Sequence, residues 1–378
     1  MKQNPRISRR DFLKLTGLGL GALAFSPLSK LYLPQFPVND RLGRVLGAVD
    51  VRSQPNSFAP VVTQLYEDTV VEWYREAIAN VTNPNTPGNQ RWVETPLGYI
   101  YSRDIQPVRN LPNTPLASLP TGEPGFWADV TVPYVDLILD NPPLRSPWAK
   151  TILETRGINP RLYFGQVVWI DLVKTENGVV YYRFNEDSPH GYGYGDVFWA
   201  EASAFRLITE EEVAPISPEV DPAQKKIVIN ITYQTLSCLE GSREVFFCRT
   251  STGLLKEQVF TDQYETPVGD MYVQWKIYSK SMGANPNEET SAAGYDTPAV
   301  PWSTFIATGG VAIHGAFWHN NFGTPRSHGC INVRPEDAKW IFRWTTPHVS
   351  LKQSEIRYTD WQLAIKDGTH VTSVKKTL

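Results

Sequence analysis

Cysteine is scarce in this sequence, with three residues among 378. An odd count leaves at least one thiol outside any disulfide, and that thiol needs another explanation. An excess of one charge is also missing: 36 Lys and Arg residues stand against 39 Asp and Glu residues, which gives no support to nucleic-acid binding. Beyond the N-terminus no apolar run reaches the roughly 20 residues that cross a bilayer, so we expect no membrane span in the mature protein.

The N-terminus resembles an export signal. In "SRRDFLKLTGLGLGALAFSP" a basic region precedes a weakly apolar run, residues 15–25, which is too short and too rich in glycine to span a bilayer. The stretch "SRRDFLK" matches the twin-arginine pattern at every fixed position, and residues 22–24 supply small side chains for cleavage. We expect residues 1–30 to be a twin-arginine signal that exports the protein to the periplasm, the cell wall or the medium. The start of a basic amphipathic helix is the alternative interpretation.

The composition predicts a mainly β protein of several modules. It is rich in Pro, Gly, Trp and Tyr and poor in long charged helical patterns, which favours short strands and turns. Residues 42–110, with "VDVRSQP" near the start and "RWVETPLGYIYSRDIQPV" at the end, resemble a bacterial Src-homology-3-like β-barrel. A proline-rich linker, residues 111–125, leads to residues 126–210, which resemble a second such module less closely because an Arg- and Pro-rich stretch intervenes.

Two local signals in these modules predict structure. The dipeptide Asn177-Gly178 separates two apolar runs and indicates a hairpin. Aromatic residues dominate the cores of small domains, so we assign four tryptophans to cores rather than to a ligand platform: Trp73, Trp92, Trp169 and Trp199.

A third domain is predicted over residues 225–374, where apolar and polar residues alternate along several strands. Cys238 and Cys248 flank a hairpin whose turn lies near Gly241, and the register places Cys238 opposite Val245. Because a three-residue offset exceeds disulfide reach, we expect both thiols to be free and buried.

Three further elements are predicted in this domain. The polar loop of residues 281–299 is long for a compact domain, and such loops often cover a site. "RPEDAKWIFRWTTP" predicts a helix that begins at Pro335, with Ala338 and Ile341 on one face. "GTHVTSV" is expected to close the domain as its last strand.

The third cysteine lies among three of the six histidines, in "VAIHGAFWHNNFGTPRSHGCINV", residues 311–333. A thiol with an ordinary pKa near 8.5 is mostly protonated at neutral pH, and an imidazole suits the removal of that proton. His328 is too close in sequence to reach Cys330 in an extended segment, whereas His314 lies on a separate strand and can approach it. Gly329 allows a sharp turn, so its N–H and that of Cys330 can face a developing oxyanion.

This segment resembles the signature of L,D-transpeptidases, cysteine enzymes that remodel peptidoglycan. Twelve residues separate His314 from "SHGCIN", and the upstream "STG" at residues 251–253 and "TPVG" at residues 266–269 are similar to further motifs of that family. The resemblance covers about residues 225–374. Many members carry Arg where this chain has Asn332, and both types occur in the family.

The resemblance implies a β-sandwich-like catalytic domain with a short helix, and a two-step acyl transfer. Cys330 attacks the carbonyl of the third stem residue, a diamino acid, and D-alanine leaves. The side-chain amine of a second stem then resolves the thioester and joins the two third residues. The base is implied to be His314, oriented by the carbonyl of Gly315, with His328 in support and Ser327 as a hydroxyl that holds the loop. Donor and acceptor stem peptides are the implied partners, and no metal or organic cofactor is called for.

Aromatic residues before both catalytic segments predict a substrate-binding wall. We expect residues 281–299 with Trp302, Phe305 and Trp318 to surround the donor stem, and Asn332 to contact substrate.

Other functions use similar residues. Zinc could be held by His314, His319, His328 and Cys330, although neither CxxC nor HExxH is present. Hydrolytic wall peptidases with Src-homology-3-like modules place the nucleophile before the histidine, the reverse of the order here. An L,D-carboxypeptidase, with water as the acceptor, remains open. A non-catalytic wall-binding protein is disfavoured by the intact "SHGC".

Overall fold

The computed structural model describes residues 34–79, 89–186, 194–255, 264–283 and 296–375. The predicted export signal and most of the predicted loop over 281–299 lie outside these residues. Residues Gln35–Leu378 form one compact unit, so the division into three domains stays a prediction. Of the helices described, none has the length and apolar character needed to cross a membrane.

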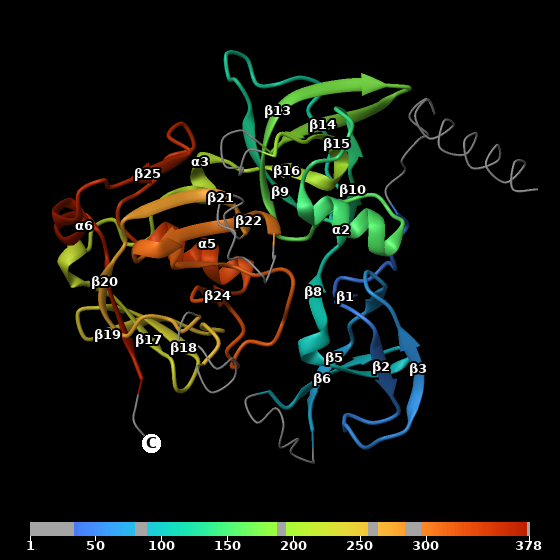
Figure 1. Cartoon of the computed structure of the whole chain (residues 1–378), viewed down its shortest axis with the longest axis horizontal. Coiled ribbons are helices and arrows are strands. Elements are labelled where there is room, and N and C mark those ends of the chain that lie inside the picture. Colours follow the sequence, from blue (N-terminus) through green and yellow to red (C-terminus); the bar gives the residue numbers. More distant parts are fainter. Residues whose placement is uncertain (1–33, 80–88, 187–193, 256–263, 284–295, 376–378) are drawn as a thin grey trace, which may run out of the picture. The chain divides into compact units, whose positions relative to one another are not determined.

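The first β segment forms two sheets around a small apolar core (Figure 1). Their strand orders are β4-β1-β8 and β3-β2-β7-β6-β5. Val45, Val71, Trp73, Val93 and Ile105 are among the side chains of that core. The elements are β1 Leu42–Val45, β2 Val49–Arg52, β3 Val61–Leu65, β4 Val70–Glu72, β5 Arg75–Ile78, β6 Arg91–Thr95, β7 Gly98–Tyr101, the 3-10 helix Ser102–Asp104 and β8 Ile105–Val108.

The second segment contains a larger sheet, with the order β11-β15-β14-β13-β9-β16, and a small sheet of β10 and β12. Asn177 and Gly178 have φ values of 52° and 80° between β13 and β14, which confirms the predicted hairpin. The elements are β9 Phe126–Val130, β10 Tyr134–Asp136, β11 Ile138–Leu139, α2 Pro147–Arg156, β12 Arg161–Tyr163, β13 Val167–Glu176, β14 Val179–Asn185, β15 Val197–Glu201, the 3-10 helix Ala202–Ala204, β16 Phe205–Leu207 and α3 Glu210–Val213.

Helix α2 was not predicted and occupies the Arg- and Pro-rich stretch that interrupts the repeat. Pro147 is its first residue, where the missing N–H costs nothing. The helix ends at Gly157, which is left-handed and donates its N–H to the carbonyl of Leu153.

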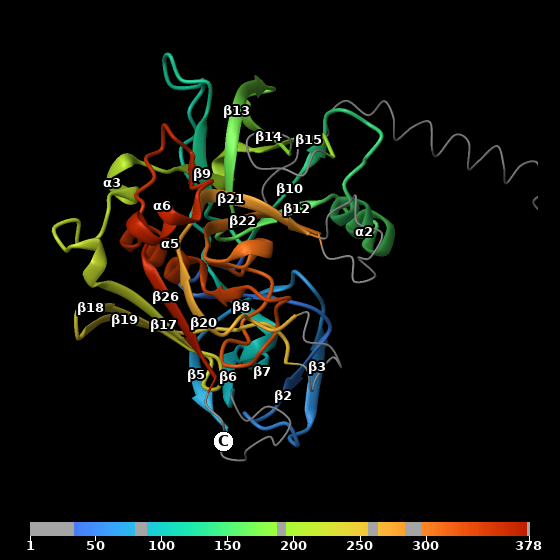
Figure 2. The same ribbon diagram turned by 60° about the vertical axis from the view of Figure 1, so that its left-hand side comes forward.

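The third segment has two five-stranded sheets, with the orders β19-β18-β17-β26-β20 and β24-β23-β22-β21-β25. Figures 1 and 2 show α5 lying against the second of these sheets. The elements are the 3-10 helix Pro222–Gln224, β17 Lys225–Asn230, β18 Thr235–Glu240, β19 Arg243–Arg249, β20 Gly269–Tyr272, β21 Trp275–Gly283, β22 Asp296–Phe305, the 3-10 helix Thr308–Gly310, β23 Ala312–Gly315, β24 Ile331–Val333, α5 Pro335–Trp344, β25 Glu355–Arg357, α6 Trp361–Asp367 and β26 His370–Val374.

The fold is mainly β, with a two-sheet C-terminal segment preceded by sheet-rich modules, as the composition predicted. The predicted helix at Pro335 and the final strand are both present, and Ala338 and Ile341 are buried. Trp73, Trp92 and Trp199 are each 7% exposed or less, as expected of core residues, whereas Trp169 is half-buried.

Cys238 and Cys248 are free and buried, as predicted. Their register is one residue away from the prediction, because a β-bulge follows Cys238 and pairs it with Phe246 instead of Val245. A bulge adds one residue to one strand, so every partner beyond it shifts by one. Cys248 pairs with Leu236.

Candidate active site

Cys330 and His314 are brought together by two neighbouring parallel strands. Strand β23 pairs with β24 so that Ile313 lies opposite Ile331 and His314 opposite Asn332. Cys330 immediately precedes β24. The pairing therefore places Cys330 two positions before the level of His314 on the neighbouring strand, and residues two apart in a strand face the same side of the sheet.

The turn before Cys330 is built around Gly329, whose φ of 116° is a conformation that other residues rarely adopt. Ser327 Oγ accepts the N–H of Gly329 at 3.2 Å and donates to the carbonyl of Cys330. Thr266 Oγ1 accepts the N–H of Gly253 at 2.9 Å and donates to the carbonyl of Gly329 at 2.8 Å. The peptide on either side of the thiol is therefore fixed by hydroxyl groups.

Residues 251–253 run alongside the cysteine segment and hold it in place. Ser251 and Asn332 exchange two backbone hydrogen bonds, at 2.8 and 2.9 Å. The N–H of Ser327 donates to the carbonyl of Thr252 at 3.1 Å. The "STG" motif thus supports the loop of Cys330 through backbone hydrogen bonds and two isolated β-bridges.

The thiol of Cys330 is protonated at neutral pH. Burial raises its pKa to about 11, although the N–H of Ala312 acts in the opposite direction. Its Sγ lies 3.6 Å from the carbonyl oxygen of Gly310, and within the described residues it makes no hydrogen bond to His314. The side chain packs against an apolar cluster that contains Phe305 and Ile277.

His314 is buried and neutral. Burial lowers its pKa to about 4, and the hydrogen bond with Gly315 opposes that shift only in part. Its side chain is 2% exposed, and Nδ1 donates to the carbonyl of Gly315 at 3.3 Å. With the proton on Nδ1, the Nε2 atom carries a lone pair that can accept a proton.

His328 and His319 have different surroundings. The ring of His328 meets Tyr264 edge to face, with the centroids 4.5 Å apart, and burial lowers its pKa. His319 is 4% exposed, and burial, followed by the charge of Arg326, lowers its pKa to about 3. In the described parts of the chain, no three His, Cys, Asp or Glu side chains are grouped as a metal site would need.

His319 fixes the orientation of Asn332. His319 Nδ1 accepts the N–H of Asn321 at 3.3 Å, so its proton lies on Nε2, 2.9 Å from the side-chain amide of Asn332. The amide of Asn332 must then present its oxygen to this N–H, which satisfies an otherwise unpaired Oδ1. The NH₂ group of Asn332 remains as a donor. His314 is paired with Asn332 on the neighbouring strand, so this donor lies beside His314.

The three aromatic residues predicted as a substrate wall are not brought to one place. Phe305 belongs to the cluster that contacts Cys330, and the Trp318 ring lies 5.7 Å from that of His314. Trp302 is 3% exposed and packs in the main core beside Phe342. Residues three apart in a strand face opposite sides, which separates Trp302 from Phe305.

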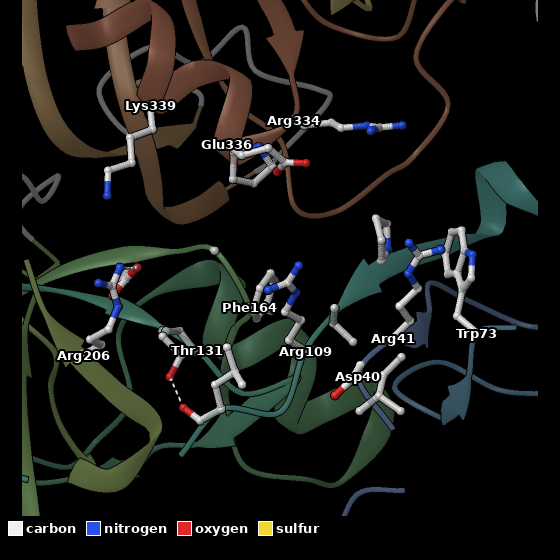
Figure 3. A pocket seen from close by; sticks show the side chains of 18 of the residues that line it. Asp40, Arg41, Trp73, Arg109, Thr131, Phe164, Arg206, Arg334, Glu336 and Lys339 are labelled. Atoms are coloured by element: carbon white, nitrogen blue, oxygen red, sulfur yellow. Dashed lines mark hydrogen bonds and ion pairs between the residues drawn. The ribbon is translucent and has the colours of Figure 1, made fainter. Parts of the chain in front are cut away.

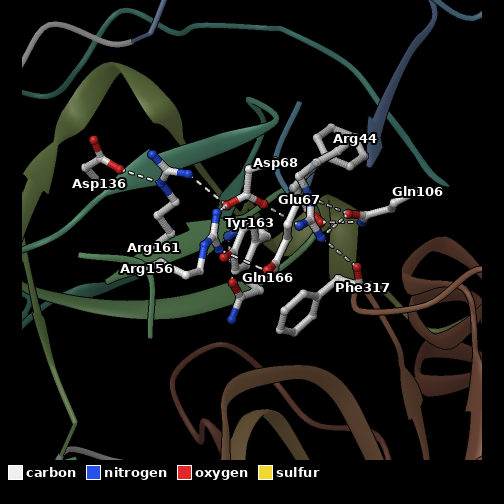
Figure 4. Close-up of polar contacts among 11 residues, drawn as sticks. Arg44, Glu67, Asp68, Gln106, Asp136, Arg156, Arg161, Tyr163, Gln166 and Phe317 are labelled. Carbon is white, nitrogen blue, oxygen red and sulfur yellow. Dashed lines mark hydrogen bonds and ion pairs between the residues drawn. The ribbon is translucent and has the colours of Figure 1, made fainter. Parts of the chain in front are cut away.

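A buried ionic network reaches the loop between the two catalytic segments (Figure 4). Arg44 and Asp68 form an ion pair at 2.8 Å, and each side chain is 3% exposed. Arg44 also donates to Gln106 Oε1 at 2.8 Å and to the carbonyl of Phe317 at 3.0 Å. Through Arg44, the first β segment therefore contacts the loop that follows His314, at a position three residues after that histidine.

Two further contacts strengthen this connection. Arg156 and Arg161 donate to the second oxygen of Asp68, at 2.7 and 2.8 Å. Burial raises the pKa of Asp68, but the three guanidinium groups outweigh it and hold the pKa below its ordinary value. The side-chain amide of Asn320 donates to the carbonyls of Ser102 and Ile105. Sequence reasoning missed these residues because their partners lie more than 20, and often more than 200, positions away.

We expect Arg44→Met to lower the free energy of unfolding by about 3 kcal/mol, because it removes one partner of a buried ion pair. Asp68 keeps two guanidinium partners, which places the loss at the lower end of the usual range. Urea unfolding followed by tryptophan fluorescence measures it. The control Arg75→Met removes an exposed partner of Glu94 and should cause no measurable change. Equal loss in the two variants would contradict a special role for the network.

Comparisons with known proteins match the C-terminal segment to one family. Residues 224–371 match the YkuD family, described as the L,D-transpeptidase catalytic domain. An L,D-transpeptidase 2 of Mycobacterium tuberculosis (strain CDC 1551 / Oshkosh) is 37% identical over 81 residues, which are 20% of this chain. The chain spans only 18% of the length of that relative.

Solved structures of L,D-transpeptidases are also similar to parts of the chain. A mutant of the Enterococcus faecium enzyme has a TM-score of 0.29 and 20% identity, and the match covers 40% of this chain and 50% of that one. An enzyme from Mycobacterium smegmatis has a TM-score of 0.30 and 16% identity, covering 52% and 90%. The family model that matches residues 224–371 is the family that the "SHGC" segment resembles.

Proposed function

We propose that the protein is a peptidoglycan L,D-transpeptidase that cross-links third stem residues through a thioester on Cys330. The observation that carries the proposal is the pairing of β23 with β24, which sets a buried neutral His314 beside the strand that begins after Cys330. The family match supports peptidoglycan cross-linking as the general activity. Peptidoglycan lies outside the cytoplasmic membrane, and residues 1–30 are proposed as the twin-arginine signal for that export.

In the first step, His314 Nε2 takes the proton of the Cys330 thiol as the sulfur attacks the carbonyl carbon of the third stem residue. Because the resting thiol has a raised pKa and the imidazole a lowered one, the proton moves during the attack rather than before it. The C–N bond to D-alanine then breaks, and the imidazolium gives its proton to the leaving amine. The product is a thioester on Cys330.

The oxyanion needs donors in both steps. The N–H of Gly329 is engaged by Ser327 Oγ at 3.2 Å, so we assign the first contact to the N–H of Cys330. The N–H of Gly329 joins it once Ser327 releases that bond. His328 lies beside Tyr264 and acts through the order of the loop.

In the second step, the side-chain amine of an acceptor stem attacks the thioester. His314 accepts a proton from this amine, and the sulfur of Cys330 leaves and is reprotonated. Substrate contacts are proposed for Phe305 and Trp318, which lie beside the two catalytic side chains. Trp302 and Asn332 were predicted with them, but they are 3% and 2% exposed, and we propose only an indirect role for each.

The test is incubation of the purified protein with a disaccharide-tetrapeptide, followed by mass spectrometry of protein and products. A transpeptidase should give a covalent adduct, free D-alanine and a cross-linked dimer of the stem. Release of D-alanine without dimer would show a carboxypeptidase, with water as the acceptor. Binding without release of D-alanine would indicate a non-catalytic wall-binding protein.

A further inference from the structure

A cleft of about 630 Å³ lies apart from the thiol, between the start of α5 and the two N-terminal β segments (Figure 3). Its volume is typical of a site that encloses a small ligand. Most of its lining comes from residues before 224, outside the segment that matches the transpeptidase family. The cleft is therefore a feature that the N-terminal segments add to the catalytic domain.

The lining of the cleft divides into an apolar part, the floor, and a charged part, the rim. Five apolar side chains from different elements or loops belong to the floor: Trp73, Val108, Leu111, Phe164 and Trp302. Some rim charges neutralise one another: Arg206 pairs with Asp129 and Glu212 at 2.8 Å, and Lys339 pairs with Glu212 at 3.0 Å. These ion pairs leave little of the charge of Arg206 and Lys339 for a ligand, whereas Asp129 Oδ1 is buried and has no hydrogen-bond partner among the described residues.

Three arginines on the rim remain available. Arg41 precedes β1, Arg109 follows β8 and Arg334 lies between β24 and α5, and all three line the cleft. Within the described residues, none of their guanidinium groups forms an ion pair or a hydrogen bond. Figure 3 shows Arg41 and Arg109 on one wall and Arg334 on the facing wall. A guanidinium fork binds carboxylates in a bidentate manner, so this convergence favours a ligand with carboxylate groups.

The cleft also offers acceptors for a cation or an amide. Asp40 and Glu336 line it without an ion pair to any described residue. A second, small cavity of about 20 Å³ is lined by Arg334 and Glu336, as the cleft is, and also by Asn320, which is 1% exposed. Asn320 Oδ1 is buried and accepts no hydrogen bond from the described chain. Since a buried acceptor without a partner is costly, a donor from a ligand would stabilise this end of the site.

The cleft is too far from the thiol to be part of the donor site. Arg334 follows Cys330 by four residues along an extended strand, which is about 13 Å at the usual rise. Trp302 reaches the cleft from β22, whereas Phe305, on the opposite face of that strand, packs in the cluster that contacts Cys330. A carbonyl that is bound within the cleft would therefore not be the one that Cys330 attacks.

We propose that this cleft binds a second stem peptide of the wall polymer through that peptide's free carboxylates. The inference rests on the proposed function, which supplies a peptide that carries carboxylates and a side-chain amine. Arg41, Arg109 and Arg334 bind the carboxylates, Asp40 and Glu336 face the amine, and the apolar floor takes the aliphatic parts of the peptide. Holding one stem of a polymer raises the effective concentration of its neighbours at Cys330.

Photo-crosslinking tests the proposal. The Cys330→Ala protein is incubated with a tetrapeptide stem that carries a diazirine, and the labelled residues are mapped by mass spectrometry. We expect labels around residues 107–111 and 334–339, in addition to labels near residue 330. The double variant Arg41→Gln and Arg109→Gln should lower cleft labelling at least tenfold, because both guanidinium groups are lost. The matched control Arg243→Gln, an exposed arginine on β19, should label as its parent does.

Two further ligands make the outcome decisive. A stem whose carboxylates are amidated should label the cleft at least tenfold less, and added salt should weaken labelling by the charged stem. Equal labelling by the amidated stem, or labelling by the disaccharide without its peptide, would overturn the proposal. Absence of cleft labels in a protein whose thermal melting is unchanged would also overturn it. Labels near residue 330, and adducts of the parent protein, report on the proposed catalytic function separately.

Discussion

Cys330→Ala is expected to abolish all covalent chemistry. A carbapenem, a drug class that acylates L,D-transpeptidases, should add its mass to the parent protein and not to the variant. Release of D-alanine and formation of the stem dimer should disappear as well, because the proposed mechanism forms its acyl intermediate on the Cys330 sulfur. Intact-mass measurement after incubation with each compound gives the result directly.

Cys248→Ala is the matched control for this experiment. Burial strongly raises the pKa of the Cys248 thiol. The thiol therefore stays protonated at neutral pH and is a poor nucleophile. The variant should therefore be acylated as the parent is. An adduct on Cys330→Ala, or an activity that requires stoichiometric zinc, would contradict the thiol mechanism.

His314→Ala is expected to slow acylation by about 10²–10⁴-fold, the usual contribution of a general base. The raised pKa of Cys330 makes this base more important, since little thiolate forms without it. The rate of carbapenem adduct formation, followed by mass spectrometry, measures the effect. His328→Ala is the comparison: its ring lies against Tyr264, so it should cost less than His314→Ala and act through the loop.

The pH dependence of acylation distinguishes a His314 that acts as a base from one that has only a structural role. The pKa of His314 is lowered to about 4, so the imidazole is neutral and ready to accept a proton at all higher pH values. Acylation by the parent should stay constant from neutral pH down to about 5 and fall only near pH 4. An acidic limb near 6.5, the ordinary histidine value, would place the base elsewhere.

The free energy of unfolding should also depend on the protonation of His314, and the lowered pKa fixes the direction of that dependence. The unfolded chain binds a proton at this histidine near pH 6.5, whereas the folded protein does so near pH 4. The contribution of His314 to stability is therefore fully present above about pH 6.5 and is lost as the pH falls toward 4. In His314→Ala that part of the acid sensitivity should be missing.

Local chemistry made several features predictable. The left-handed turn at Asn177 and Gly178 and the helix that begins at Pro335 depend on the backbone preferences of single residues. The "SHGC" segment likewise implied a thiol with a histidine from another strand. The hairpin of Cys238 was predicted with the right turn but the wrong register, since a bulge depends on packing across the sheet rather than on the turn.

The amino-acid sequence by itself determined the β-rich class and the resemblance of the C-terminal segment to the family whose model matches residues 224–371, and it singled out Cys330 and His314 as the proposed thiol and base. Each of these depends on short patterns of residue types. Only the tertiary structure decided that Trp302 is a core residue and that Arg44 holds the loop after His314. It alone brought Arg41, Arg109 and Arg334 to one cleft. These arrangements depend on contacts between positions up to about 290 residues apart, and burial and charge pairing at that range leave no periodic trace in the sequence.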